Sequence, residues 1–163
     1  MTEPRVPVHV SNHLFCVVDS DTYDITSADY SDGLILVMAR GAMIRTGIHT
    51  GTVHVTARPL NDPPDQPDPG PWEEITEASI YTHTGQLGVD ILYPDTYPDT
   101  YLDLPDLAHA GPGWYRLRAH ARGRDTAPGA LRDDSDEDYL LLCWPAPRSA
   151  TNPIHTRPAP GKA

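Results

Sequence analysis

Proline and glycine interrupt this sequence so often that it cannot form a helical fold. The 163-residue chain holds 18 prolines and 12 glycines. Proline lacks the amide hydrogen that a helix needs, and glycine loses more backbone entropy than other residues on becoming helical. No window longer than ten residues keeps the 3.6-residue apolar spacing of an amphipathic helix without one of these residues in it. The chain therefore predicts a fold built from short strands and turns.

Nine short segments carry strand patterns. The run LFCVV at 14–18 and the run LILVMA at 34–39 are continuously apolar, as in strands that are buried on both faces. Residues 51–58 alternate small or apolar residues with polar ones, as in a half-buried strand. The expected strands are 6–10, 14–18, 34–39, 43–48, 51–58, 72–82, 87–92, 114–124 and 139–144. This number of strands predicts an all-β, single-domain antiparallel β-sandwich or a flattened barrel.

The strand patterns define one domain over residues 1–147. The stretch NDPPDQPDPGP at 61–71 is expected to be a loop, because its prolines cannot donate the hydrogen bonds of a helix or a central strand. Residues 148–163 are rich in proline and contain no acidic residue, and we expect this tail to be disordered. The chain start has no signal-peptide pattern and no apolar run reaches bilayer length, which favours a cytoplasmic protein. The two cysteines are then expected to be buried free thiols.

The net charge of −11 restricts the partners of the chain. A negative field repels nucleic acids and anionic membranes and attracts basic proteins. The acidic loop at 125–138, DTAPGALRDDSDED, is the leading candidate for a partner-binding surface, with a solvated loop without a partner as the alternative. Its candidate residues are Asp133, Asp134, Asp136, Glu137 and Asp138.

A second candidate surface follows from the strict alternation in WYRLRAHARGRD at 114–125. In a strand, one face would carry the basic groups Arg116, Arg118, His120, Arg122 and Arg124. Neighbouring cations on that face repel one another unless acidic residues compensate them, and Glu73 and Glu77 have the spacing to do so from another strand. The face is thus interpreted as a solvated layer of Arg–Glu pairs, or alternatively as an anion-binding face.

Patterns for catalysis and for metal binding are missing from the sequence. It has no nucleophile elbow, phosphate-binding glycine loop, dinucleotide fingerprint or Cys-x-x-Cys pair, so no enzyme activity, no cofactor and no metal are predicted. The tandem YPDT repeat at 93–100 places aspartates four residues apart but lacks the form of a calcium loop. Its rings, Tyr93, Tyr97 and Tyr101, are an alternative carbohydrate-binding surface. A hydrolase would require a polar pocket that the sequence does not reveal.

Four stretches together show a family resemblance over most of residues 8–147. They are NHLFCVVDSD, GLILVMARGAMIRTGIHTG, GPGWYRLRAHARGRD and DEDYLLLCWPAP. The chain resembles uncharacterised actinobacterial proteins and, more distantly, the competence protein J family of small β-rich inhibitors that bind a DNA-entry nuclease. The matching positions are structural: Tyr115, Leu117, Tyr139 and Trp144. The YPDT repeat and the proline loop have no counterpart in this resemblance.

These observations predict a non-enzymatic, acidic binding protein. We expect an inhibitor or immunity-type protein whose partner is a basic protein such as a nuclease or toxin. The alternative is a module that binds a small anion or a carbohydrate through the arginine-rich face or the tyrosine-rich loop.

Overall fold

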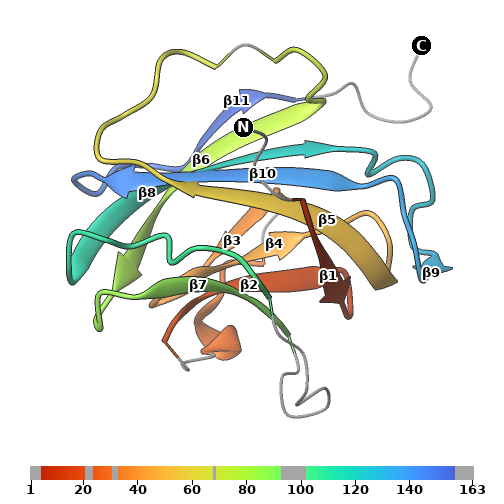
Figure 1. Cartoon of the computed structure of the whole chain (residues 1–163), viewed down its shortest axis with the longest axis horizontal. Coiled ribbons are helices and arrows are strands. Elements are labelled where there is room, and N and C mark those ends of the chain that lie inside the picture. The colour runs from red at the N-terminus through yellow and green to blue at the C-terminus, as the bar shows by residue number, and fades with distance from the viewer. Residues whose placement is uncertain (1–4, 21–23, 31–32, 68, 93–101, 157–163) are drawn as a thin grey trace.

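The computed structural model describes residues 5–20, 24–30, 33–67, 69–92 and 102–156. It contains eleven strands and a single turn of 3-10 helix, η1 (Ile25–Ser27), within these residues (Figure 1). The strands are β1 (Val6–Val10), β2 (Leu14–Asp19), β3 (Ile35–Val37), β4 (Ala42–Arg45), β5 (Thr50–Pro59), β6 (Glu74–Thr82), β7 (Leu87–Ile91), β8 (Gly113–Arg122), β9 (Leu131–Arg132), β10 (Asp138–Pro145) and β11 (Asn152–His155). Each of the nine expected segments overlaps a strand, which confirms the all-β prediction.

The strands form two sheets that pack face to face. The larger sheet has the order β1-β5-β10-β8-β6-β11, with β9 paired to β5, and the smaller has the order β3-β4-β2-β7. Neighbouring strands are antiparallel except that β10 and β9 both run parallel to β5. Figure 1 shows the two sheets as separate layers, so the described strands make a sandwich and not a closed barrel.

The core of the sandwich lies between the two sheets. Phe15 of β2 and Tyr139 of β10 meet across it edge to face, with ring centroids 5.3 Å apart. Two buried tyrosines, Tyr115 and Tyr139, add large rings to this core, and their hydroxyl groups have hydrogen-bond partners. Tyr115 Oη donates a hydrogen bond to the carbonyl of Gly111 at 2.8 Å and accepts one from the amide of Ala110 at 2.9 Å. Burial of these large rings adds to the apolar area removed from water on folding.

A buried carboxylate ties the smaller sheet to the β6–β7 hairpin. Asp19, at the end of β2, accepts hydrogen bonds from the hydroxyl groups of Thr82 and Thr84 and from the amide of His83. Burial alone would raise the pKa of Asp19, but these donors outweigh burial and hold the pKa below its ordinary value. Asp19 is therefore an ionised clamp on the hairpin.

Two segments cover the outer face of the larger sheet. Residues 61–67 of the proline loop lie over β8 and β10, as expected for a loop. The C-terminal segment forms β11 beside β6 (Figure 1). The expectation that residues 148–163 are disordered is wrong for residues 148–156. Asn152 aligns with Glu77 and Pro153 with Thr76 in an antiparallel pair, so backbone pairing orders this segment. Residues 157–163 lie outside the described residues.

No helix among the described residues has both the length and the apolar character that crossing a bilayer requires.

Candidate functional site

The acidic loop at 125–138 is fixed to the body of the sandwich by a buried glutamate. The two carboxylate oxygens of Glu137 accept hydrogen bonds from the amides of Gly47, at 2.9 Å, and Ile48, at 2.7 Å. The hydroxyl group of Tyr139 donates a further hydrogen bond to Glu137. Burial and the charge of Glu137 raise the pKa of Tyr139 well above its ordinary value, so this phenol stays protonated as a donor.

Backbone hydrogen bonds hold the rest of the loop against the same edge of the sandwich. The amide of Gly129 donates to the carbonyl of Gly47 at 2.7 Å, and the amide of His49 donates to the carbonyl of Ala130 at 2.8 Å. The Ser135 hydroxyl donates to the carbonyl of Thr52 at 2.7 Å. The loop is thus attached along its length and needs little further ordering to bind a partner.

Two glycines allow this close packing. Gly51 has a φ of 143°, and a Cβ there would collide with the carbonyl oxygen of Arg132. Gly123 has a φ of 84°, and its Cβ would collide with the carbonyl oxygen of Asp136. Both backbones approach the loop at distances that only a residue without a side chain permits.

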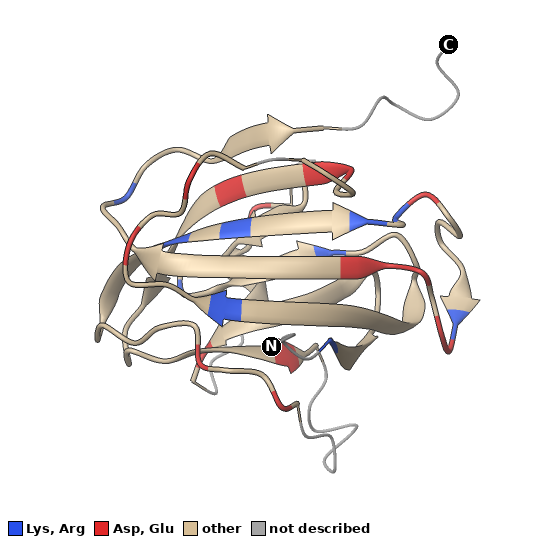
Figure 2. Cartoon of the chain, turned by 45° about the horizontal axis from the view of Figure 1, so that its top comes forward, with Lys and Arg blue, Asp and Glu red and all other residues tan. Residues whose placement is uncertain are grey.

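The loop presents an apolar side chain among exposed acidic ones. Leu131 is 77% exposed, the most exposed of the large hydrophobic residues described. Asp133, Asp134 and Asp136 are exposed within five residues of it, and Figure 2 shows acidic positions of this loop at the end of the larger sheet, beside β9. Sequence reasoning missed Leu131. Its one sequence signal is a leucine isolated in a polar, acidic stretch.

The structure separates the five predicted acidic residues into two groups. Asp133, Asp134 and Asp136 lie on the surface as expected, but Glu137 and Asp138 are 1% and 9% exposed. Asp138 accepts hydrogen bonds from Arg5 Nε at 2.9 Å and from Arg122 Nη2 at 3.0 Å. The prediction that Glu137 and Asp138 contact a partner is therefore corrected, since internal amides and arginines already occupy their oxygens.

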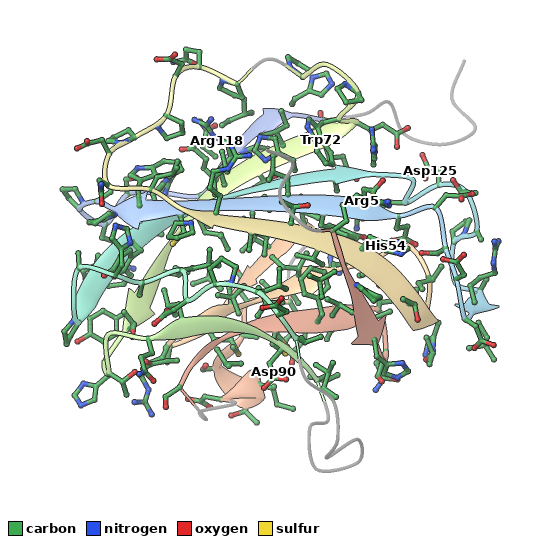
Figure 3. All side chains as sticks on the ribbon, in the orientation of Figure 1. Arg5, His54, Trp72, Asp90, Arg118 and Asp125 are labelled. Carbon is green, nitrogen blue, oxygen red and sulfur yellow. The ribbon has the colours of Figure 1, made fainter. Side chains whose placement is uncertain are left out.

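The alternation in β8 is confirmed for its core-facing half. Tyr115, Leu117, Ala119 and Ala121 are buried in the main core. The expectation that the opposite face is solvated is wrong, because Arg116, Arg118 and His120 are only 7%, 6% and 5% exposed. The proline loop and the C-terminal segment cover them, and Figure 3 shows Arg118 and Trp72 between the larger sheet and these coverings.

Arginine side chains on this face pair with neighbouring strands and with the covering segments. Glu77 of β6 bridges two of them, accepting from Arg116 Nε at 3.2 Å and from Arg118 Nε at 2.7 Å. Arg116 also donates to the carbonyls of Ser149 and Ala150 in the C-terminal segment, at 3.2 and 2.8 Å. The predicted compensation by Glu77 is confirmed.

The proline loop is attached to the same face through Arg118 and Trp72. Arg118 Nη1 donates a hydrogen bond to the carbonyl of Asp65 at 3.1 Å. The Trp72 ring lies 5.6 Å from the His120 ring, and the guanidinium of Arg122 lies 5.1 Å from the Trp72 ring centroid. The basic residues of β8 therefore anchor both the proline loop and the C-terminal segment to the larger sheet.

Arg124 does not share the face of the other four basic residues. The strand ends at Arg122, and the positive φ of Gly123 turns the chain. Arg124 Nη1 then donates hydrogen bonds to both carboxylate oxygens of Glu74, at 2.7 and 2.6 Å. Glu74 pairs in register with Ala121, whose side chain faces the core. Glu73, the other predicted compensator, accepts instead from the amide of Gly123.

His120 and the two cysteines lie in buried surroundings. His120 Nδ1 lies 3.1 Å from the carbonyl of Leu140, so the neutral ring donates there. Cys16 and Cys143 are buried free thiols, and burial raises the pKa of each to about 12, with smaller contributions from Asp90 and Asp106. Among the described residues, no three His, Cys, Asp or Glu side chains come together in a group that could hold a metal ion.

The YPDT repeat and its rings Tyr93, Tyr97 and Tyr101 lie outside the described residues. The predicted carbohydrate surface on these rings therefore stays a prediction.

Comparison with known proteins finds no match: no family model, no curated protein and no solved structure corresponds to this chain.

Proposed function

We propose that this chain is a non-enzymatic protein-binding domain, of inhibitor or immunity type, that recognises a basic protein through its acidic loop. The observation that carries the proposal is the exposed Leu131 beside Asp133, Asp134 and Asp136, on a loop that internal hydrogen bonds already hold in place. The interaction surface of the proposal is these four residues, called the acidic loop surface below.

Charge and apolar contact have separate roles at such a surface. The three aspartates are part of the net charge of −11 and concentrate negative charge on the loop. This charge steers a basic partner toward the loop and raises the association rate at low salt. Leu131 supplies an apolar anchor that a partner pocket can desolvate, and burying an exposed leucine side chain is favourable by about 1.5 to 3 kcal/mol. A preordered loop also avoids the entropy cost of ordering on binding.

Affinity capture from a lysate of the source organism tests the proposal. The triple variant Asp133→Asn, Asp134→Asn, Asp136→Asn is compared with the wild-type chain at low and at moderate salt. The wild-type chain is expected to retain a basic protein that the triple variant loses, and retention should fall as salt screens the charges.

A matched control separates this surface from general acidity. The variant Asp62→Asn, Asp65→Asn, Asp103→Asn removes the same three charges from exposed positions outside the loop. It should retain the same protein as the wild-type chain. Equal loss from both triple variants, or no basic protein retained by the wild-type chain, would reject the proposal.

A further inference from the structure

A pocket of about 730 Å³ opens between the proline loop and the C-terminal segment. Its walls come from Pro63, Pro64 and Gln66 on one side and from β11 on the other, and Trp144 lies at its floor. It is reached at the end of β10 remote from the acidic loop, since Trp144 is near the last residue of β10 and Asp138 is the first. The volume falls within the range of small-molecule sites.

The charged residues that line this pocket are Glu77, Arg116, Arg118 and Arg148. Three arginines against one glutamate give the described lining a formal charge of +2 in a chain whose net charge is −11. Both oxygens of Glu77 are already occupied by Arg116 and Arg118. Arg116 and Arg118 are buried and share the single carboxylate of Glu77. A positive charge that is buried without a full counter-charge is costly, and a bound anion would relieve that cost.

The two buried arginines, Arg116 and Arg118, differ in whether a guanidinium nitrogen remains available to bind a ligand. Every guanidinium nitrogen of Arg116 has an acceptor: Nε donates to Glu77, Nη1 to Ser79 and Ser149, and Nη2 to Ala150. Arg118 uses Nε for Glu77 and Nη1 for the Asp65 carbonyl, and no described residue accepts a hydrogen bond from its Nη2. Arg118 is one of the residues that line the pocket, and its Nη2 is not among the fully buried, unpartnered nitrogens of the described residues.

Arg148 supplies a second, exposed cation at the mouth of the pocket. Its guanidinium lies 5.3 Å from the ring centroid of Trp114, which holds it against the start of β8. A fixed guanidinium presents paired donors that match the oxygens of a phosphate or a carboxylate.

From this geometry we propose that the pocket binds a small organic anion, with the phosphate or carboxylate oxygens of the ligand on Arg118 Nη2 and Arg148. The Pro63, Pro64 and Pro153 side chains contact the remaining, uncharged part of the ligand. This site is independent of the acidic loop surface, and either proposal can fail without the other.

Isothermal titration of the full chain at low ionic strength tests the site with three probes: inorganic phosphate, adenosine monophosphate and citrate. We expect saturable binding of at least one probe with a Kd below about 1 mM. Binding of phosphate or the nucleotide but not citrate assigns a phosphate ligand, and the reverse assigns a carboxylate. Heteronuclear NMR should then show shifts at the Arg118 Nε–H and the Trp144 indole N–H.

Three variants locate the binding. Arg148→Gln removes an exposed cation, and Arg118→Lys keeps a charge beside Glu77 while removing the guanidinium fork. Each should raise the Kd at least fivefold, about 1.6 units of ln K or more. Arg132→Gln removes one charge from the acidic loop and should leave the Kd within twofold of wild type. The proposal is overturned if no probe saturates below about 1 mM, or if Arg148→Gln and Arg118→Lys both bind as the wild-type chain does.

Discussion

Glu137 and Ile48 are 89 residues apart in the chain, and a hydrogen bond of 2.7 Å joins the carboxylate of the first to the amide of the second. With the parallel contact to Gly47, it fixes the acidic loop to the turn before β5. A carboxylate in an acidic run thus serves as an internal anchor, and the exposed aspartates around it are displayed from a fixed backbone.

Replacing this anchor should lower stability and loosen the loop. Glu137→Ala leaves the amides of Gly47 and Ile48 and the Tyr139 hydroxyl without their acceptor, which should reduce the free energy of unfolding by about 3 kcal/mol. Urea unfolding measures this loss. Asp136→Ala, at the exposed neighbouring position, is the control and should change stability by less than about 0.5 kcal/mol. Equal effects of the two substitutions would contradict the anchoring role of Glu137.

The contrast between exposed Asp136 and buried Glu137 shows what the sequence could and could not predict about this loop. An acidic run predicts exposure, and Asp133, Asp134 and Asp136 follow that rule. The burial of Glu137 depends on two amides from a turn 90 residues earlier, and no local pattern reveals that contact. Leu131 was overlooked for the same reason, since its exposure depends on how the loop is attached.

The same distinction applies to β8. Its period-two pattern predicts the strand and its core-facing residues, because side-chain alternation is a local property of the backbone. The covering of the opposite face comes from the proline loop and from β11, which lie far away in sequence. The short strand β11 includes Pro153 and pairs at the edge of the sheet, so its composition looks like that of a disordered tail.

The attachment of the C-terminal segment depends on Ser79. Its hydroxyl oxygen accepts hydrogen bonds from Arg116 Nη1 at 3.1 Å and from the amide of Ser149 at 2.9 Å. Ser79→Ala should cost about 1 to 2 kcal/mol and speed hydrogen exchange in residues 149–155. Ser149→Ala keeps the backbone amide and should leave exchange in this segment unchanged. Slow exchange in the Ser79 variant would show that the segment is held by other contacts.

His120 should make stability depend on pH near neutrality. Burial lowers its pKa below the ordinary value of 6.5, and the positive charge of Arg118 acts in the same direction, against the hydrogen bond to the Leu140 carbonyl. The unfolded chain therefore binds a proton more readily than the folded one, and stability falls as pH decreases below about 6.5. Urea titrations from pH 8 to pH 5 should show a shallower decline for His120→Gln. An identical decline would exclude His120 as its source.

Asp19 should contribute in a more acidic range. Its pKa is held below the ordinary value of 3.8, so its stabilising effect is complete above that pH and is lost as the pH falls through the lower, folded-state value. At pH 6, Asp19→Asn should lower the free energy of unfolding by about 2 kcal/mol, because charge-assisted hydrogen bonds to Thr82 and Thr84 are weakened. The gap between variant and wild type should narrow by pH 3. A gap that stays constant with pH would contradict the role of the ionised carboxylate.

The most direct test of the binding proposal is the affinity of Leu131→Ser for the protein that the wild-type chain captures, measured by isothermal titration at low and moderate salt. This substitution leaves the net charge unchanged. We predict a Kd at least tenfold higher than that of the wild-type chain at both salt concentrations, because an apolar anchor is lost, about 1.4 kcal/mol or more. An unchanged Kd would show that Leu131 is not part of the interface.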